Sequence, residues 1–213
     1  MEIMNPTPNA EGRRAFTIVE LLVVILIIGI LVAFAFPVFQ GVLERAKKVQ
    51  AKNDLTQIVT AVNAFYTEYG KYPLVTDDTP IANTADLFYT LRAVASGANA
   101  PVNGVPAINP RAIVFISPPD VKNAANPRSG IGITTGVGQW YDPWGTTYKV
   151  AVDGTYDNQI ANPYGAAGGA GSDPLRQGVI AWSLGKDTKL GNNGDNLYKN
   201  ASGVQSDDVI SWQ

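Results

Sequence analysis

The sequence predicts an α+β protein in which one long N-terminal helix packs on a small antiparallel β-sheet. Three observations lead to this fold class. An almost unbroken apolar run covers residues 16–39, and an amphipathic stretch with the period of a helix follows it up to Tyr69. The C-terminal half then alternates short β-branched segments with loops rich in Gly, Asn, Asp and Pro, which is typical of strands joined by turns.

The apolar run is long enough to cross a bilayer, whose core needs about 20 apolar residues. It reads FTIVELLVVILIIGILVAFAFPVF, and Arg13 and Arg14 directly precede it. The basic flank places the leader, residues 1–15, on the cytoplasmic side. A conventional secretory signal has an apolar region of about 7–15 residues, which is shorter than this run. We therefore expect a single-pass membrane anchor.

Glu20 is the only charged residue in the run. A carboxylate costs about 2.5–3.5 kcal/mol at the centre of a bilayer and less near its surface, so it usually has a partner. Two partners remain open for Glu20. One is Arg13 or Arg14 of the same chain, and the other, which we favour, is a group on another subunit.

These residues resemble the class III signal sequence of type IV pilins and type II secretion pseudopilins. The matching stretch, residues 13–22, reads RRAFTIVELL. In that family a prepilin peptidase cleaves before the phenylalanine and the new amine is methylated, which implies a cut between Ala15 and Phe16. Ala15 stands where the family usually has Gly. Cutting after Gly12 instead would leave a charged residue first and put Glu20 out of register.

The resemblance also implies roles for two residues of the mature chain. Glu20, the fifth residue after the cut, corresponds to the glutamate that meets the N-terminal amine of a neighbouring subunit during assembly. Pro37 matches a position where the helix is kinked or locally melted in the fibre. From its chemistry alone, Pro37 is expected to interrupt the helix, since it removes a hydrogen bond and clashes with the preceding turn.

Composition excludes several classes of function. The 213 residues include no Cys and no His, and the net charge is −2. The usual zinc ligands, thiol nucleophiles and Ser-His triads are therefore ruled out, and nucleic-acid binding lacks a basic tract. We predict a non-enzymatic chain. Many type IV pilins close their C-terminal region with a disulfide, so the lack of Cys favours a pseudopilin.

The second helical segment, residues 40–72, is expected to carry the helix into the globular part. Its apolar residues recur every three or four positions from Leu55 to Tyr69, which predicts one buried face. Gly70 is the predicted C-cap. Residues 73–213 form a loop-rich C-terminal domain, with the middle part, about 96–140, expected to be an insertion. Its predicted elements are a helix at 85–95, a strand or buried turn at 112–116, a tight turn at 142–145, and strands at 146–152, 178–184 and 209–212.

The C-terminal half resembles the major pseudopilin of type II secretion. The resemblance rests on DPWG at 142–145, SLGKD at 183–187 and DDVISW at 207–212. In that family the corresponding loop binds calcium through carboxylates and backbone carbonyls, and calcium takes 6–8 oxygen ligands. The resemblance implies a site formed by Leu184, Asp187, Asp195, Asp207 and Asp208. The alternative is a solvated loop, because Asn, Asp and Gly favour turns for their own reasons.

Together these features predict a structural subunit of a type II secretion pseudopilus. The chain is expected in the bacterial inner membrane with its C-terminal domain in the periplasm, and then in a periplasmic helical fibre. Expected partners are copies of itself, minor pseudopilins, the inner-membrane assembly platform and prepilin peptidase. Two alternatives stay open: a type IV pilus pilin for adhesion, motility or DNA uptake, and a membrane-anchored enzyme or binding domain that never polymerises.

Overall fold

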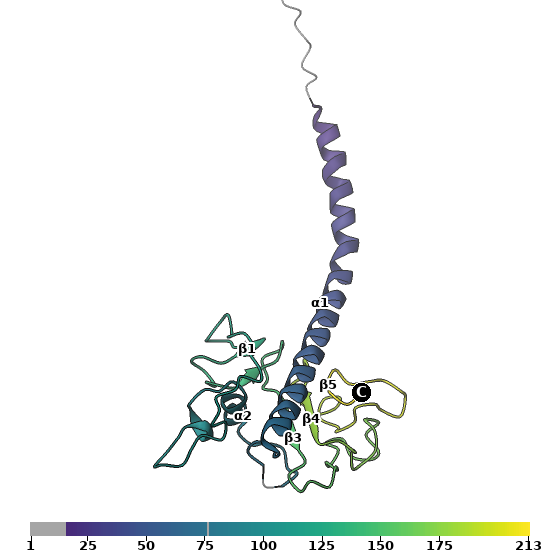
Figure 1. Cartoon of the computed structure of the whole chain (residues 1–213). Helices are drawn as coiled ribbons and strands as arrows, with labels where there is room; N and C mark the ends of the chain where they lie inside the picture. Colours follow the sequence, from purple (N-terminus) through teal and green to yellow (C-terminus); the bar gives the residue numbers. More distant parts are fainter. Residues whose placement is uncertain (1–15, 76) are drawn as a thin grey trace, which may run out of the picture. The chain divides into compact units, whose positions relative to one another are not determined.

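The computed structural model describes residues 16–75 and 77–213, without the side chains of residues 35–40. The chain divides into two compact units, one ending at Glu44 and the other comprising Arg45–Gln213. The elements confirm the α+β class with a long N-terminal helix (Figure 1). They are α1 (Ile18–Tyr69), α2 (Thr84–Leu91), the 3-10 turn η1 (Gly97–Asn99), β1 (Gly130–Ile131), β2 (Trp140–Tyr141), β3 (Lys149–Val152), β4 (Val179–Ser183) and β5 (Val209–Ile210).

Helix α1 continues through Pro37 without a break in its helical backbone. Pro37 therefore does not interrupt the helix of the single chain as its chemistry predicts, and the kink or local melting that the resemblance implies for the fibre stays a prediction. A proline removes one hydrogen bond from the ladder and is compatible with a helix that its other bonds sustain. The helix ends as predicted: Gly70 has φ +69°, and its N–H donates to Tyr66 O at 2.8 Å.

One face of the second half of α1 builds the main hydrophobic core. Leu55, Ile58, Val62 and Phe65 are fully buried, as their three- and four-residue spacing predicts. The side chains packed with them come from α2 and the strands, and include Phe88, Trp140, Tyr148, Val150 and Ala181. The amphipathic stripe is therefore the surface on which the C-terminal domain rests.

Strands β3, β4 and β5 form an antiparallel sheet in that order. All five residues of β4, the central strand, are buried. The three strands lie inside the segments predicted for them, but β3 begins at Lys149 and β5 ends at Ile210.

Three features differ from the predictions for the middle of the chain. Helix α2 ends at Leu91, four residues early, because Ala93 has φ +57° and Val94 N–H donates to Tyr89 O at 2.9 Å, which are the marks of a Schellman stop. Residues 112–116 form neither strand nor helix. An antiparallel pair, β1 with β2, was not predicted.

Candidate functional site

The first half of α1 exposes its apolar side chains. Between Phe16 and Phe34 every large hydrophobic residue has 45–84% of its surface exposed. A contiguous apolar surface of this kind marks a site of contact with lipid or with another protein. Among the residues whose side chains are described, no helix meets the length and hydropathy requirements of a membrane span.

Glu20 closes a capping box at the start of α1. Its Oε2 accepts hydrogen bonds from the backbone N–H and the hydroxyl of Thr17, both at 2.9 Å. In return, the N–H of Glu20 donates to Thr17 Oγ1 at 3.3 Å. Each side chain satisfies a backbone donor that the helix start leaves unpaired. Sequence reasoning missed Thr17, although the spacing T-x-x-E is the known signal for this arrangement.

Asp187, Asp207 and Asp208 gather at the end of β4 and the start of β5. Each offers a carboxylate oxygen, and these oxygens lie within 4.8 Å of one another. Asp208 is buried, and its Oδ2 accepts from Tyr164 Oη at 2.8 Å and from Gly191 N at 2.7 Å. Burial, with Asp207 nearby, raises the pKa of Asp208 to about 6.

One oxygen of this group has no hydrogen-bond donor. Among the described residues, Asp208 Oδ1 and the hydroxyl of Ser206 are both buried and make no hydrogen bond, although Ser206 lies close enough to Asp208 to lower its pKa. A buried carboxylate oxygen without a donor is costly unless a cation faces it. Asp187 and Asp207 line a groove together with Lys48 and Lys186, whereas Asp208 lies buried behind them with 3% of its surface exposed. The donor set of three carboxylates is the chemistry that Ca²⁺ prefers.

The other two residues predicted for this site lie differently. Asp195 is outside the group of three, and its Oδ1 accepts from Asn192 N at 2.8 Å and Leu197 N at 2.9 Å. Leu184 directly follows β4, and its side chain packs, half-buried, on a second apolar cluster.

Asp142 has a structural role that the turn prediction did not specify. It is fully buried, and its Oδ1 accepts from the backbone N–H groups of Trp144, Gly145 and Thr146 at 2.7–2.9 Å. Its Oδ2 accepts from Ser183 Oγ at 2.6 Å. Asp142 thus closes the DPWG turn and ties it to β4, one residue before Leu184.

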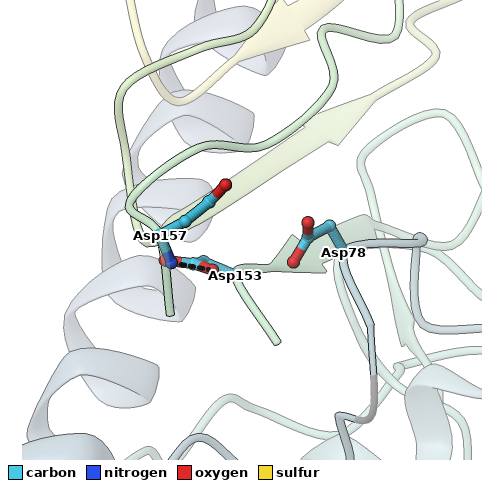
Figure 2. A group of neighbouring side chains, drawn as sticks. All are labelled: Asp78, Asp153 and Asp157. Carbon is cyan, nitrogen blue, oxygen red and sulfur yellow. Dashed lines mark hydrogen bonds between the residues drawn. The ribbon is translucent and has the colours of Figure 1, made fainter. Parts of the chain in front are cut away.

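A second acidic group comprises Asp78, Asp153 and Asp157, which come from two segments of the chain (Figure 2). Its carboxylates already serve the backbone. Asp153 accepts from Asp157 N at 3.2 Å and Asn158 N at 2.7 Å, and Asp78 accepts from Gly154 N at 2.9 Å. These bonds hold the loop after β3 in its conformation. They account for the closeness of the three carboxylates without a metal ion.

Comparison with known proteins supports one family. Residues 12–36 match the model of the prokaryotic N-terminal methylation motif. The chain is 32% identical over 107 residues to the type IV major pilin protein PilA of Myxococcus xanthus, covering 46% of this chain and 49% of the relative. It is also 36% identical over 95 residues to the fimbrial protein EcpC of Eikenella corrodens, covering 45% and 61%. The chain is similar to type IV pilins and fimbrial proteins.

The relatives indicate which class of proteins the chain resembles, and they do not distinguish between roles within that class. A fimbrial protein of Pseudomonas aeruginosa is 31% identical over 88 residues, covering 41% of this chain and 56% of the relative. The chain thus spans about half the length of the relatives it matches. They are structural proteins and not enzymes, in agreement with the predicted non-enzymatic chain. No solved structure matches it.

The methylation motif gives the pilin-like chain a membrane-anchored precursor. Phe16 lies just before the helix and is 78% exposed. Ala15 and the leader lie outside the described residues, as do Arg13 and Arg14, the same-chain partners considered for Glu20. The side chain of Pro37 is outside them too.

Proposed function

We propose that this chain is a subunit of a helical fibre that is assembled from a membrane-anchored precursor. The observation that carries the proposal is the exposed apolar surface of α1 between Phe16 and Phe34. At about 25 cal/mol per Å² of apolar surface, leaving it in water is highly unfavourable. Lipid covers this surface before assembly, and the same segments of other copies cover it afterwards.

The fibre follows from the way such copies pack. When the contact joins two different surfaces of the same chain and its rotation does not close, assembly continues as an open filament. The apolar helices then occupy the centre of the fibre, where neither water nor lipid reaches them. The Arg45–Gln213 units, with their polar loops, face the solvent.

Glu20 sets the register between copies. Burying its carboxylate is costly unless it meets a positive charge, and cleavage before Phe16 creates an amine four residues away in the sequence. That amine on a neighbouring copy supplies the charge. The capping box with Thr17 occupies only Oε2, so the local bond and the contact between copies use different oxygens.

Two substitutions of Glu20 separate the helix cap from the contact between copies. Glu20→Leu removes both. Glu20→Gln retains the cap, since a capping box accepts Gln as well as Glu, but it removes the charge. We expect both variants to insert into the membrane and neither to form fibres, as measured by membrane fractionation and electron microscopy of sheared cells.

Two controls complete this experiment. Thr17→Val removes the two bonds of the Thr17 hydroxyl and leaves the charge, so it should still assemble, with fewer fibres than the wild type. Glu20→Gln forming fibres in wild-type number would show that Glu20 only caps the helix. A wild-type chain that remains monomeric in the membrane beside its assembly proteins would contradict the proposed function.

Two kinds of fibre are supported by different observations. The named relatives, which are type IV pilins and fimbrial proteins, favour a pilus. The DPWG turn tied to β4 and the acidic group beside β5 favour a type II secretion pseudopilus, because these are the features that resemble its major subunit. Deleting the chromosomal gene distinguishes them: loss of surface fibres indicates a pilus, and loss of protein export indicates a pseudopilus.

We also infer that Asp187, Asp207 and Asp208 bind calcium. The support is the buried oxygen of Asp208 without a donor and the closeness of three carboxylates. The carbonyl of Leu184 and the side chain of Asp195 are further ligands on this proposal. Asp195 has to leave its present hydrogen bonds to take part, so we expect it to contribute least.

The remaining partners belong to the same proposal. Prepilin peptidase cleaves between Ala15 and Phe16, and the inner-membrane platform and minor pilin-like subunits start the fibre. The leader stays in the cytoplasm and the Arg45–Gln213 unit is exported to the periplasm. N-terminal sequencing of the mature chain tests the cut, which should leave a methylated phenylalanine first.

A further inference from the structure

Three tyrosines from separate segments stack at the surface of the Arg45–Gln213 unit. Tyr66 lies on α1, Tyr72 follows its end, and Tyr156 lies in the loop after β3. Ring centroids are 4.5 Å apart for Tyr66 and Tyr72, 5.7 Å for Tyr72 and Tyr156, and 6.3 Å for Tyr66 and Tyr156. Tyr66 is 39% exposed and Tyr156 is 51% exposed. We refer to these three residues as the tyrosine face.

The loop after β3 holds Tyr156 in place through a strained backbone. Tyr156 has φ +62°, which is unfavourable for a residue of this kind, and Asn158, a residue type that tolerates the left-handed region, has φ +59°. Buried Asp153 maintains this conformation by accepting from the N–H of Asp157 (Figure 2) and from the N–H of Asn158. The hydroxyl of Tyr156 in turn accepts from Tyr72 N at 3.1 Å. Such strain persists where the surroundings impose it and gathers at functional surfaces.

The tyrosine face carries an acidic rim. Exposed Asp157 follows Tyr156 in the chain and lies in one acidic group with half-buried Asp78 and buried Asp153. Asp153 lies close enough to contribute to the raised pKa of Tyr72, whose main cause is burial. Lys71, next to Tyr72 in the chain, is exposed as well. Electron-rich rings beside carboxylates attract a cationic group, and a guanidinium can also lie flat on a ring.

The opposite end of the same helix segment is cationic. Residues 45–52 of α1 hold four basic residues: Arg45, Lys47, Lys48 and Lys52. Lys48 and Lys52 donate to backbone carbonyls of the C-terminal segment, whereas Arg45 is exposed. Arg45 precedes Tyr66 by 21 residues, which corresponds to about 31 Å along a helix.

We propose that the tyrosine face binds Arg45 of a second copy of this chain. Two copies displaced by about 31 Å along α1 bring the cationic start of one helix segment level with the acidic, aromatic end of the other. The two surfaces differ and lie at opposite ends of one unit, as a contact that propagates an open filament requires. The inference rests on the proposed fibre function and specifies one of its contacts.

Introduced cysteines test this contact directly, because the chain has none of its own. The Arg45→Cys/Tyr156→Cys variant is expressed in cells that carry the assembly proteins. Its fibres are then oxidised, and the subunits are separated on a non-reducing gel. We expect a ladder of linked copies that is absent from either single variant. The control pair Arg45→Cys/Val105→Cys, which uses a valine that is 66% exposed in another loop, should yield no ladder.

A charge exchange tests the same contact without cross-linking. Arg45→Glu should lower the number of fibres about tenfold, and adding Asp157→Arg should restore them. Lys122→Glu, at an exposed lysine remote in sequence from both surfaces, should have no effect. Three results would each overturn the inference and leave the fibre function standing. Arg45→Glu could form fibres in near-normal number, or Asp157→Arg could fail to restore them. The third is that fibres of the double-cysteine variant form but give no ladder of linked copies. A wild type that forms no fibres would overturn both.

Discussion

The hydroxyl of Tyr148 donates a 2.8 Å hydrogen bond to Asp54 Oδ2, which lies 94 residues earlier in the chain. Both residues are buried, Tyr148 completely. Burial raises the pKa of Asp54, and burial together with the Asp54 carboxylate raises the pKa of Tyr148. Asp54 lies on α1, and Tyr148 directly precedes β3. The bond therefore links the helix to the sheet inside the main hydrophobic core.

Removing the Tyr148 hydroxyl should therefore destabilise the fold. Tyr148→Phe leaves a buried carboxylate without its donor, which costs about 1–3 kcal/mol. Urea unfolding of the purified chain measures the change. Tyr89→Phe is the matched control, because the Tyr89 hydroxyl donates to Val137 O at an exposed position, and its loss should cost less than about 1 kcal/mol. Equal losses for both variants would mean that the Tyr148 bond has no special role.

Asp54 should also make stability depend on pH. Its pKa is raised above the ordinary value of 3.8 by burial, so the folded chain retains a proton that the unfolded chain has already lost. The free energy of unfolding falls with pH wherever the folded state binds more protons. It should therefore fall as the pH rises from about 4 to the raised pKa of Asp54, and then level off.

Asp54→Asn isolates this contribution. Asparagine does not titrate, yet it retains an oxygen that can accept from Tyr148. The variant should gain stability relative to the wild type as the pH rises from 4 to 7, measured by urea unfolding in the presence of a chelator. Parallel pH profiles for the two proteins would contradict the assignment.

Lys52 should hold the C-terminal segment on α1. Its Nζ donates to Ile210 O at 2.8 Å and Ser211 O at 3.2 Å, and also to Gln213 O, and burial lowers its pKa. Lys52→Met retains the aliphatic stem and removes these bonds, at a cost of about 1.5–3 kcal/mol. Hydrogen exchange should speed up over residues 209–213. Lys122→Met, at an exposed lysine, should leave exchange unchanged, and protection that survives in Lys52→Met would refute this role.

Calcium should stabilise the chain through Asp187, Asp207 and Asp208. An ion present at a hundred times its Kd adds about 2.7 kcal/mol to the free energy of unfolding. For a unit of this size that raises Tm by about 5–10 °C. Asp187→Ala should abolish the shift, whereas Asp157→Asn, in the other acidic group, should retain it. Asp195→Asn should reduce it only partly, and a wild-type Tm that ignores both calcium and chelator would remove the site.

The parts of the fold that sequence predicted are those set by local periodicity. The stripe from Leu55 to Phe65 repeats every three or four residues, and β4 follows from a run of β-branched and apolar residues between Gly-rich loops. Gly70 ends α1 because the required left-handed conformation favours glycine. Each of these signals lies within the segment that it describes.

The missed features depend on contacts between distant segments. Strand β2 is two residues long, and Trp140 is held there by edge-on packing with Phe88 and Tyr148, each with centroids 5.6 Å apart. The burial of Asp208 likewise depends on Tyr164, 44 residues earlier. Neither is visible in a pattern along the chain. The cap of Thr17 on Glu20 is local and matches the T-x-x-E spacing of a capping box, although it was not predicted.

The central claim is that Glu20 meets the processed end of a neighbouring copy. A high-resolution reconstruction of the assembled fibre tests it most directly, by reading the distance from the Glu20 carboxylate to the amine of Phe16 in each adjacent copy. We predict a charge-assisted hydrogen bond of about 2.7–2.9 Å. A fibre in which Glu20 contacts only its own Thr17, with every neighbouring amine out of reach, would contradict it.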